Sequence, residues 1–163
     1  MSSGATLINT AKVVGRRKLH FQSFEDVLRE LTFLEGKHLR VQGNWSVGQI
    51  LYHLSIPIDG AVDGLPFQMP WYLRWGATML KPLILRMKMP AGFKLPPDAA
   101  AKMVPPPTAE DVGYAALRRS ISRFREAKSL HPHPIFGRLS PRDWEQIMCR
   151  HCELHLSFIT PEN

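Results

Sequence analysis

Cysteine is scarce in this sequence, and its scarcity excludes one class of protein. Only 2 cysteines occur among 163 residues, at Cys149 and Cys152. A small secreted domain held together by disulfides needs several such pairs, so this chain does not belong to that class. The two residues form a C-x-x-C motif in the middle of a predicted helix, away from the helix N-terminus that would stabilise a thiolate. We expect small core residues here, with a redox role as the alternative.

The sequence also lacks a long, uninterrupted apolar run. The best candidate for a membrane span, residues 71–89, is broken by four Lys and Arg residues and by Pro82, so we expect no transmembrane helix. The first fifteen residues have neither a basic start nor an apolar stretch, and a signal peptide needs both. These absences predict a cytoplasmic protein.

Acidic residues are in the minority. The chain has 21 Lys and Arg against 14 Asp and Glu, which gives a formal net charge of +7 and a pI near 9.8. Such a balance suits nucleic acid, anionic lipid or an anionic small molecule without selecting one. No helix-turn-helix or zinc-finger pattern is present, so we expect a small-molecule substrate rather than nucleic acid or a membrane. A homodimer stays open.

No segment alternates apolar and polar residues for long enough to predict a sheet, whereas four segments have helical periodicity and start signals. In the first, residues 20–36, Ser23 is the expected cap and Gly36 the expected stop. The second, residues 44–64, opens on a capping box of Ser46 and Gln49 and carries Pro57, which should kink it.

The third segment begins at Thr108 with acidic residues and ends near residue 128 with basic ones, as the helix dipole favours. The fourth begins with Ser140 as cap and Pro141 at the first position, and is expected to run about 20 residues, to Pro161. Four amphipathic helices predict an all-α four-helix bundle, with residues 1–163 forming one domain.

The connection between the second and third helices, residues 65–107, is far longer than the usual 2 to 8 residues or so. Its basic, aromatic-rich centre, PWYLRWGATMLKPLILRMKMP, predicts further helical turns. We expect a helix-containing crossover that covers one end of the bundle. A membrane-surface segment and a lid over a pocket are the alternatives.

Histidine is the main chemical clue, with 7 in the chain. A helical wheel at about 100° per residue places His151 and His155 one turn apart on the apolar face of the last helix. A buried histidine is costly unless each ring nitrogen has a partner, and imidazoles at i and i+4 can reach one metal ion. His53, at the flank of the second helix's apolar stripe, is the third candidate ligand. The pattern alone leaves hydrogen-bonded core histidines as an equal alternative.

Two blocks carry a family resemblance. NWSVGQILYHL, around His53, and HPIFGRLSPRDWEQIMCRHCELHL, at the end of the chain, resemble the DinB/YfiT-like superfamily of metal-binding four-helix bundles, and more narrowly one of its uncharacterised branches. The resemblance covers roughly half of the chain. It implies that His53, His151 and His155 are the three metal ligands.

The resemblance also implies an activity, namely thiol-dependent S-transferase or isomerase chemistry with a low-molecular-weight thiol as co-substrate. Three neutral ligands leave at least one position of a divalent ion open to water or substrate, as in catalytic sites, so metal-water hydrolysis is the second hypothesis. Zinc or nickel suits imidazole best, followed by manganese or iron. A non-catalytic bundle that binds a metal or a small molecule is the alternative.

Three further residues complete the predicted site. His133, Cys152 and Trp144 are candidates to support the ligands, and each has a purely structural alternative: a rigid turn, a small core residue and a core anchor. Trp45 is expected to act as a hydrophobic staple for the second helix. Glu153 is expected to point away from the site into solvent.

Overall fold

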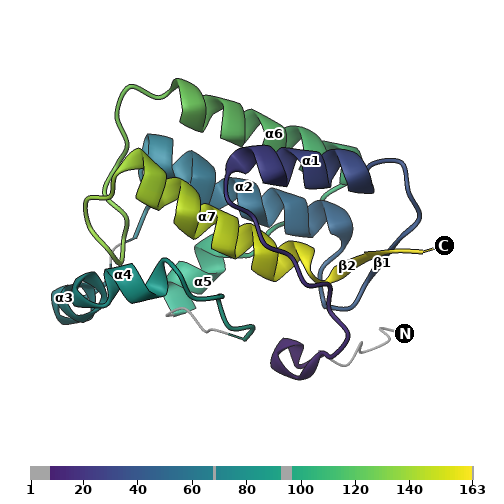
Figure 1. The fold of residues 1–163 in the computed structure, drawn as a ribbon, viewed down its shortest axis with the longest axis horizontal. Helices are drawn as coiled ribbons and strands as arrows, with labels where there is room; N and C mark the ends of the chain where they lie inside the picture. The colour runs from purple at the N-terminus through teal and green to yellow at the C-terminus, as the bar shows by residue number, and fades with distance from the viewer. Residues whose placement is uncertain (1–7, 68, 93–96, 163) are drawn as a thin grey trace.

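Helices dominate the computed structural model, which describes residues 8–67, 69–92 and 97–162 (Figure 1). Four long helices lie side by side: α1 (Phe24–Leu34), α2 (Val47–Asp63), α6 (Glu110–Glu126) and α7 (Pro141–Leu156). The shorter elements are the 3-10 helix η1 (Thr10–Lys12), α3 (Trp71–Met79), α4 (Lys81–Ile84), α5 (Pro97–Met103) and the strands β1 (Leu39–Val41) and β2 (Ile159–Pro161). The expectation of a mainly helical fold is confirmed.

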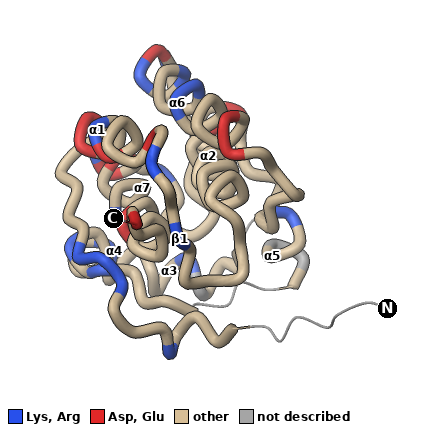
Figure 2. The backbone as a smooth tube through the Cα atoms, turned by 90° about the vertical axis from the view of Figure 1, so that its right-hand side faces the viewer, with Lys and Arg blue, Asp and Glu red and all other residues tan. Residues whose placement is uncertain are grey.

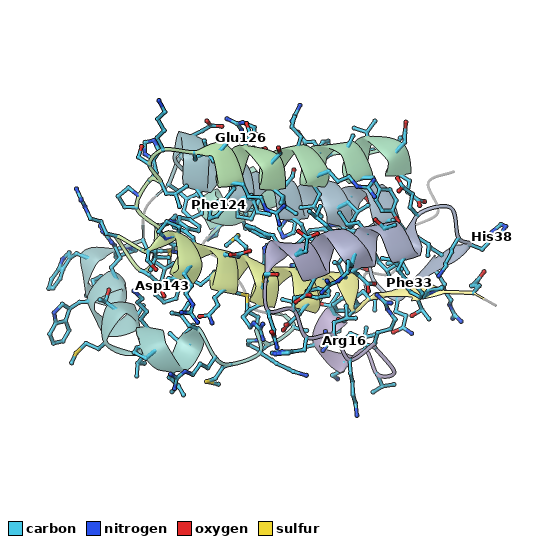
Figure 3. The ribbon with its side chains drawn as sticks, turned by 45° about the horizontal axis from the view of Figure 1, so that its top comes forward. Arg16, Phe33, His38, Phe124, Glu126 and Asp143 are labelled. Carbon is cyan, nitrogen blue, oxygen red and sulfur yellow. The ribbon has the colours of Figure 1, made fainter. Side chains whose placement is uncertain are left out.

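The hydrophobic core lies between the four long helices, which Figure 2 shows nearly end-on. Trp144 of α7 is fully buried in it. Phe124 of α6 points toward α1 (Figure 3), where its ring meets Phe24 edge-on with 5.2 Å between centroids. Apolar residues from all four helices therefore share one continuous cluster, and burial of this cluster is the main stabilising contribution.

The helix starts of α2 and α7 follow the predicted capping chemistry. The Ser46 hydroxyl accepts a hydrogen bond from the Gln49 backbone N–H at 3.2 Å, and the Gln49 side chain accepts one from the Ser46 N–H at 3.0 Å. At α7 the Ser140 hydroxyl accepts from the Asp143 N–H at 3.1 Å. These bonds fix where the two histidine-bearing helices begin.

The start of α1 differs from its prediction. Ser23 occupies the cap position with extended backbone, but its side chain makes no capping bond. Instead, the carboxylate of Glu145 on α7 accepts from the Phe24 N–H at 2.7 Å, so a neighbouring helix supplies the cap. The predicted stop is present, with Gly36 at φ +77° just beyond the end of α1.

The end of the last helix was predicted wrongly. The last helix stops at Leu156, because residues Ile159–Pro161 form β2 rather than a further helical turn. This strand pairs antiparallel with β1, with Val41 opposite Ile159, in a sheet that the sequence does not predict. Three-residue strands are too short to show an alternating pattern.

The crossover contains helices, as predicted. α3, α4 and α5 lie between α2 and α6 in the sequence, and Figure 1 shows them beside the four long helices. Residues 68 and 93–96 of the crossover, like residues 1–7 of the segment searched for a signal peptide, lie outside the described part of the chain. Across the described residues, none of the helices combines the length and the apolarity that crossing a bilayer requires.

The N-terminal segment is bound to α7 by buried charges. Glu153, only 6% exposed, accepts a hydrogen bond from the Phe21 N–H at 2.6 Å and pairs with Arg150 at 2.9 Å. Arg150 in turn donates to the Phe21 carbonyl and contacts the His20 ring. Glu153 does face away from the three histidines, but the prediction that it is solvated was wrong, because residues before α1 cover it.

The closest helix contact, between α2 and α6, depends on two glycines. A Cβ at Gly113 would lie 2.7 Å from the Gly48 carbonyl oxygen, and one at Gly48 would lie 2.3 Å from the Thr108 carbonyl oxygen. Both contacts are with backbone atoms, which cannot swing aside as a side chain can. The absence of a Cβ at these positions therefore sets the separation of α2 from α6.

We expect Gly113→Ala to lower the free energy of unfolding by about 1–3 kcal/mol, because the added methyl group forces the two backbones apart. Gly76→Ala is the matched control, since a Cβ at this position of α3 meets nothing within 4 Å. The control should be neutral or stabilising by up to ~1 kcal/mol. Equal unfolding curves for the wild type and Gly113→Ala in denaturant titrations would contradict the close packing.

Candidate metal centre

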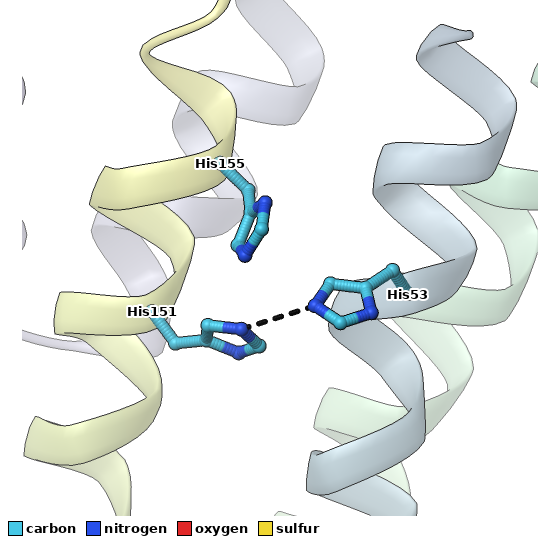
Figure 4. A group of neighbouring side chains, drawn as sticks. All are labelled: His53, His151 and His155. Atoms are coloured by element: carbon cyan, nitrogen blue, oxygen red, sulfur yellow. Dashed lines mark hydrogen bonds between the residues drawn. The ribbon is translucent and has the colours of Figure 1, made fainter. Parts of the chain in front are cut away.

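Three histidines from two helices meet between α2 and α7 (Figure 4). His53 comes from the middle of α2, and His151 and His155 come from successive turns of α7. Nε2 of His53 and Nε2 of His151 are 3.2 Å apart. Each ring offers one nitrogen such that all three lie within 4.8 Å of one another. The three residues predicted from the sequence are thus brought together.

A backbone carbonyl determines which ring nitrogen of His53 can bind a metal ion. Its Nδ1 lies 2.8 Å from the Met103 carbonyl oxygen, which can only accept, so Nδ1–H is the donor. The lone pair is therefore on Nε2, the atom that faces His151. A carbonyl that accepts from the second ring nitrogen is the usual support of a metal-ligating histidine. Here α5, at the end of the crossover, provides it.

The spacing of the nitrogens fits a shared ion. Two imidazole nitrogens bound to one ion at about 2.0–2.1 Å, with a tetrahedral angle between them, lie about 3.3 Å apart. The 3.2 Å between Nε2 of His53 and Nε2 of His151 matches this separation. Among the described residues, the grouping contains three neutral donors and no carboxylate or thiolate. That donor set suits zinc or nickel and leaves the ion's charge uncompensated.

The surroundings hold the three rings in the neutral form that a metal requires. Burial lowers the pKa of His53 and, more strongly, that of His151, whose pKa the adjacent rings of His155 and His53 lower further. Burial and the proximity of His53 lower the pKa of His155 to about 3. Protons therefore compete weakly for these nitrogens at neutral pH.

Two neighbours of the cluster were missed by the sequence analysis. The Trp45 indole stacks on His155, with 5.7 Å between centroids and 18° between planes, and lies 4.7 Å from the His53 ring. It covers the cluster rather than acting only as a staple. Arg16, in the N-terminal segment, is close enough to lower the pKa of His155. The position of Trp45 one residue before the cap of the histidine-bearing helix is a signal that could have revealed the first contact.

His133 lies next to the cluster but is held by its own turn. Its Nδ1 accepts hydrogen bonds from the Ile135 and Phe136 N–H groups at 3.1 and 3.3 Å, and its ring packs on Trp144 with 4.7 Å between centroids. Trp144 donates from Nε1 to the His131 carbonyl at 3.2 Å. Both residues thus make contacts that shape the loop before α7, and their support of the metal ligands stays a prediction.

Cys152 is a buried, protonated thiol. Burial raises its pKa well above the ordinary value, and burial raises that of Cys149 to about 12. Both cysteines are free rather than disulfide-bonded. A thiol in this state is a poor nucleophile and a poor ligand, which agrees with small core residues.

These observations define a mainly helical protein with a partly buried three-histidine cluster between two of its long helices. A family model described as "Protein of unknown function (DUF1569)" matches residues 13–162. The chain belongs to this family. Comparisons with curated proteins and with solved structures found no match.

We expect the stability of the metal-free protein to depend on pH through His133. Burial lowers the pKa of His133 to about 4, whereas an unfolded histidine titrates near 6.5. The unfolded chain therefore binds a proton that the folded chain excludes, so the free energy of unfolding should fall as the pH drops from about 6.5 to about 4, by about 3 kcal/mol from this residue.

His133→Asn is the matched variant, because its side-chain oxygen can accept from the same N–H groups without titrating. Denaturant unfolding of the metal-free proteins across this pH range should show a smaller loss of stability for the variant. Equal losses in both proteins would show that His133 does not carry this pH dependence.

Proposed function

We propose that this protein is a metal-dependent enzyme of the DinB/YfiT-like type, in which α1, α2, α6 and α7 form the four-helix bundle. His53, His151 and His155 hold one divalent ion, zinc or nickel, and the reaction is a thiol-dependent S-transfer or isomerisation. The observation that carries the proposal is the close approach of two Nε2 atoms from different helices, 3.2 Å apart, within a cluster of three imidazoles.

Two neutral imidazoles placed this way are costly without something shared. Because Nε2 of His53 carries a lone pair, only a proton on Nε2 of His151 could join the two rings in the absence of an ion. That hydrogen bond would join His53 and His151 and would leave His155 without a partner in the cluster. An ion satisfies all three rings at once, which supports metal binding over hydrogen-bonded core histidines.

The chain's own residues organise the site for an exchangeable ligand. The Met103 carbonyl orients His53, and Trp45 shields the faces of His53 and His155 from water. His151 and His155 each retain partial exposure, so a small molecule has a route to the cluster. When bound, the ion would lower the pKa of a coordinated thiol or water and so generate a nucleophile at neutral pH. Arg16 adds positive charge that favours an anionic co-substrate.

Metal content provides the first test. We expect the wild type to bind about one zinc or nickel ion per chain, and His155→Ala to lower the affinity by at least about 100-fold, since three ligands are reduced to two. His131→Ala is the matched control, because His131 is an exposed loop histidine outside the cluster. Elemental analysis after dialysis against defined metal concentrations gives the answer. Equal metal content in all three proteins would refute the site.

Thiol binding provides the second test, which separates the reaction classes. In the cobalt-substituted protein, a coordinated thiolate should add an intense sulfur-to-cobalt band when a low-molecular-weight thiol is added. A spectrum that does not respond to thiols would overturn the S-transfer assignment. If the same spectrum shifts with pH near 7, a metal-bound water is present and hydrolysis takes the place of S-transfer. A spectrum that responds to neither would leave a non-catalytic metal site.

A further inference from the structure

The crossover turns its large apolar side chains outward. Trp71, Trp75 and Met79 of α3 are 79%, 69% and 68% exposed. The same stretch exposes four more large apolar residues: Tyr72, Leu80, Leu83 and Met87. A soluble surface carries isolated apolar residues, but a run of seven within seventeen positions marks a surface that another phase or molecule covers. Figure 3 shows side chains of α3 and α4 extending away from the four long helices.

The inward side of this segment is small by comparison. Leu85 is buried in the core, and Ala77, Ile84 and Met89 pack against it. Lys81 ties α4 to Asp143 at the start of α7, with 2.7 Å between the charged atoms. The segment is therefore attached to the rest of the protein. The exposure of its apolar side chains does not arise because the segment has come away from the long helices.

The charged residues of the segment itself have one sign. The sequence has no acidic residue between Asp63 and Asp98. Arg86 and Lys88 are exposed beside Met87, and Asp143 of α7, which lies against the segment, is paired with Lys81. Helices that lie in the interface of an anionic bilayer are typically rich in tryptophan and tyrosine, with Lys and Arg residues between them.

We propose that the segment Trp71–Met89 docks the protein on an anionic lipid surface, with the indoles of Trp71 and Trp75 at the headgroup level and Arg86 and Lys88 on the lipid phosphates. This is the membrane-surface alternative for the crossover, and it goes beyond the proposed metal chemistry. A second copy of the chain fits the surface less well, because the segment carries Lys and Arg but no Asp or Glu, so two such segments facing each other would repel.

Vesicle binding tests the proposal. The full chain is mixed with large vesicles of phosphatidylcholine alone or with about one third phosphatidylglycerol, and binding is followed by co-sedimentation. We expect binding to the anionic vesicles only. Trp71→Ala with Trp75→Ala should weaken it by at least about tenfold, since both aromatic anchors are lost. Arg86→Gln with Lys88→Gln should weaken it by roughly 25-fold, about fivefold for each cation, and added salt should have a similar effect.

Two matched control variants remove residues of the same kinds from outside the segment. Phe33→Ala removes a half-exposed aromatic residue from α1, and Lys37→Gln with Lys128→Gln removes two exposed cations outside the segment. Both should bind the anionic vesicles like the wild type. Absence of binding, or equal binding by the Trp71 and Trp75 double variant, would overturn the proposal. So would a dimer in sedimentation experiments that this double variant converts to a monomer, because a second copy would then cover the surface.

Discussion

The central constraint in this protein is the packing of three uncharged, largely buried imidazoles where α2 and α7 meet. Burial lowers the pKa of each ring, and a ring nitrogen that is shielded from water needs a partner from the protein or from a bound ion. One of the six nitrogens, Nδ1 of His53, has a protein partner in the Met103 carbonyl. This bond places the lone pair of His53 on Nε2, which faces α7. The position of α5 therefore decides which nitrogen of His53 is available to a metal ion.

The rest of the fold keeps these two helices in place. Gly48 and Gly113 let α2 approach α6 closely, and the Phe21 backbone joins the N-terminal segment to α7 through Arg150 and Glu153. The crossover contributes from the other side, because its last helix carries Met103. Segments far apart in the sequence thus converge on the histidine cluster, and none of them contributes a carboxylate to it among the described residues.

The sequence predicts the parts of this arrangement that depend on local rules. Capping by Ser46 and Ser140, the stop at Gly36 and the i, i+4 spacing of His151 and His155 follow from backbone geometry and could be identified without a structure. Contacts over long distances in the sequence could not. Examples are the cap that Glu145 supplies to α1, the burial of Glu153 and the stacking of Trp45 on His155. These depend on how the helices pack, which a single sequence does not encode in any local pattern.

The coordination of the bound ion tests the account most directly. X-ray absorption spectroscopy on the zinc-loaded full chain reads the donor atoms without reference to activity. The account predicts scattering from three imidazole rings with nitrogen at about 2.0–2.1 Å and no sulfur. A sulfur shell at about 2.3 Å would place the ion on Cys149 and Cys152 instead, and fewer than two imidazoles would show that the histidines of α2 and α7 do not share an ion.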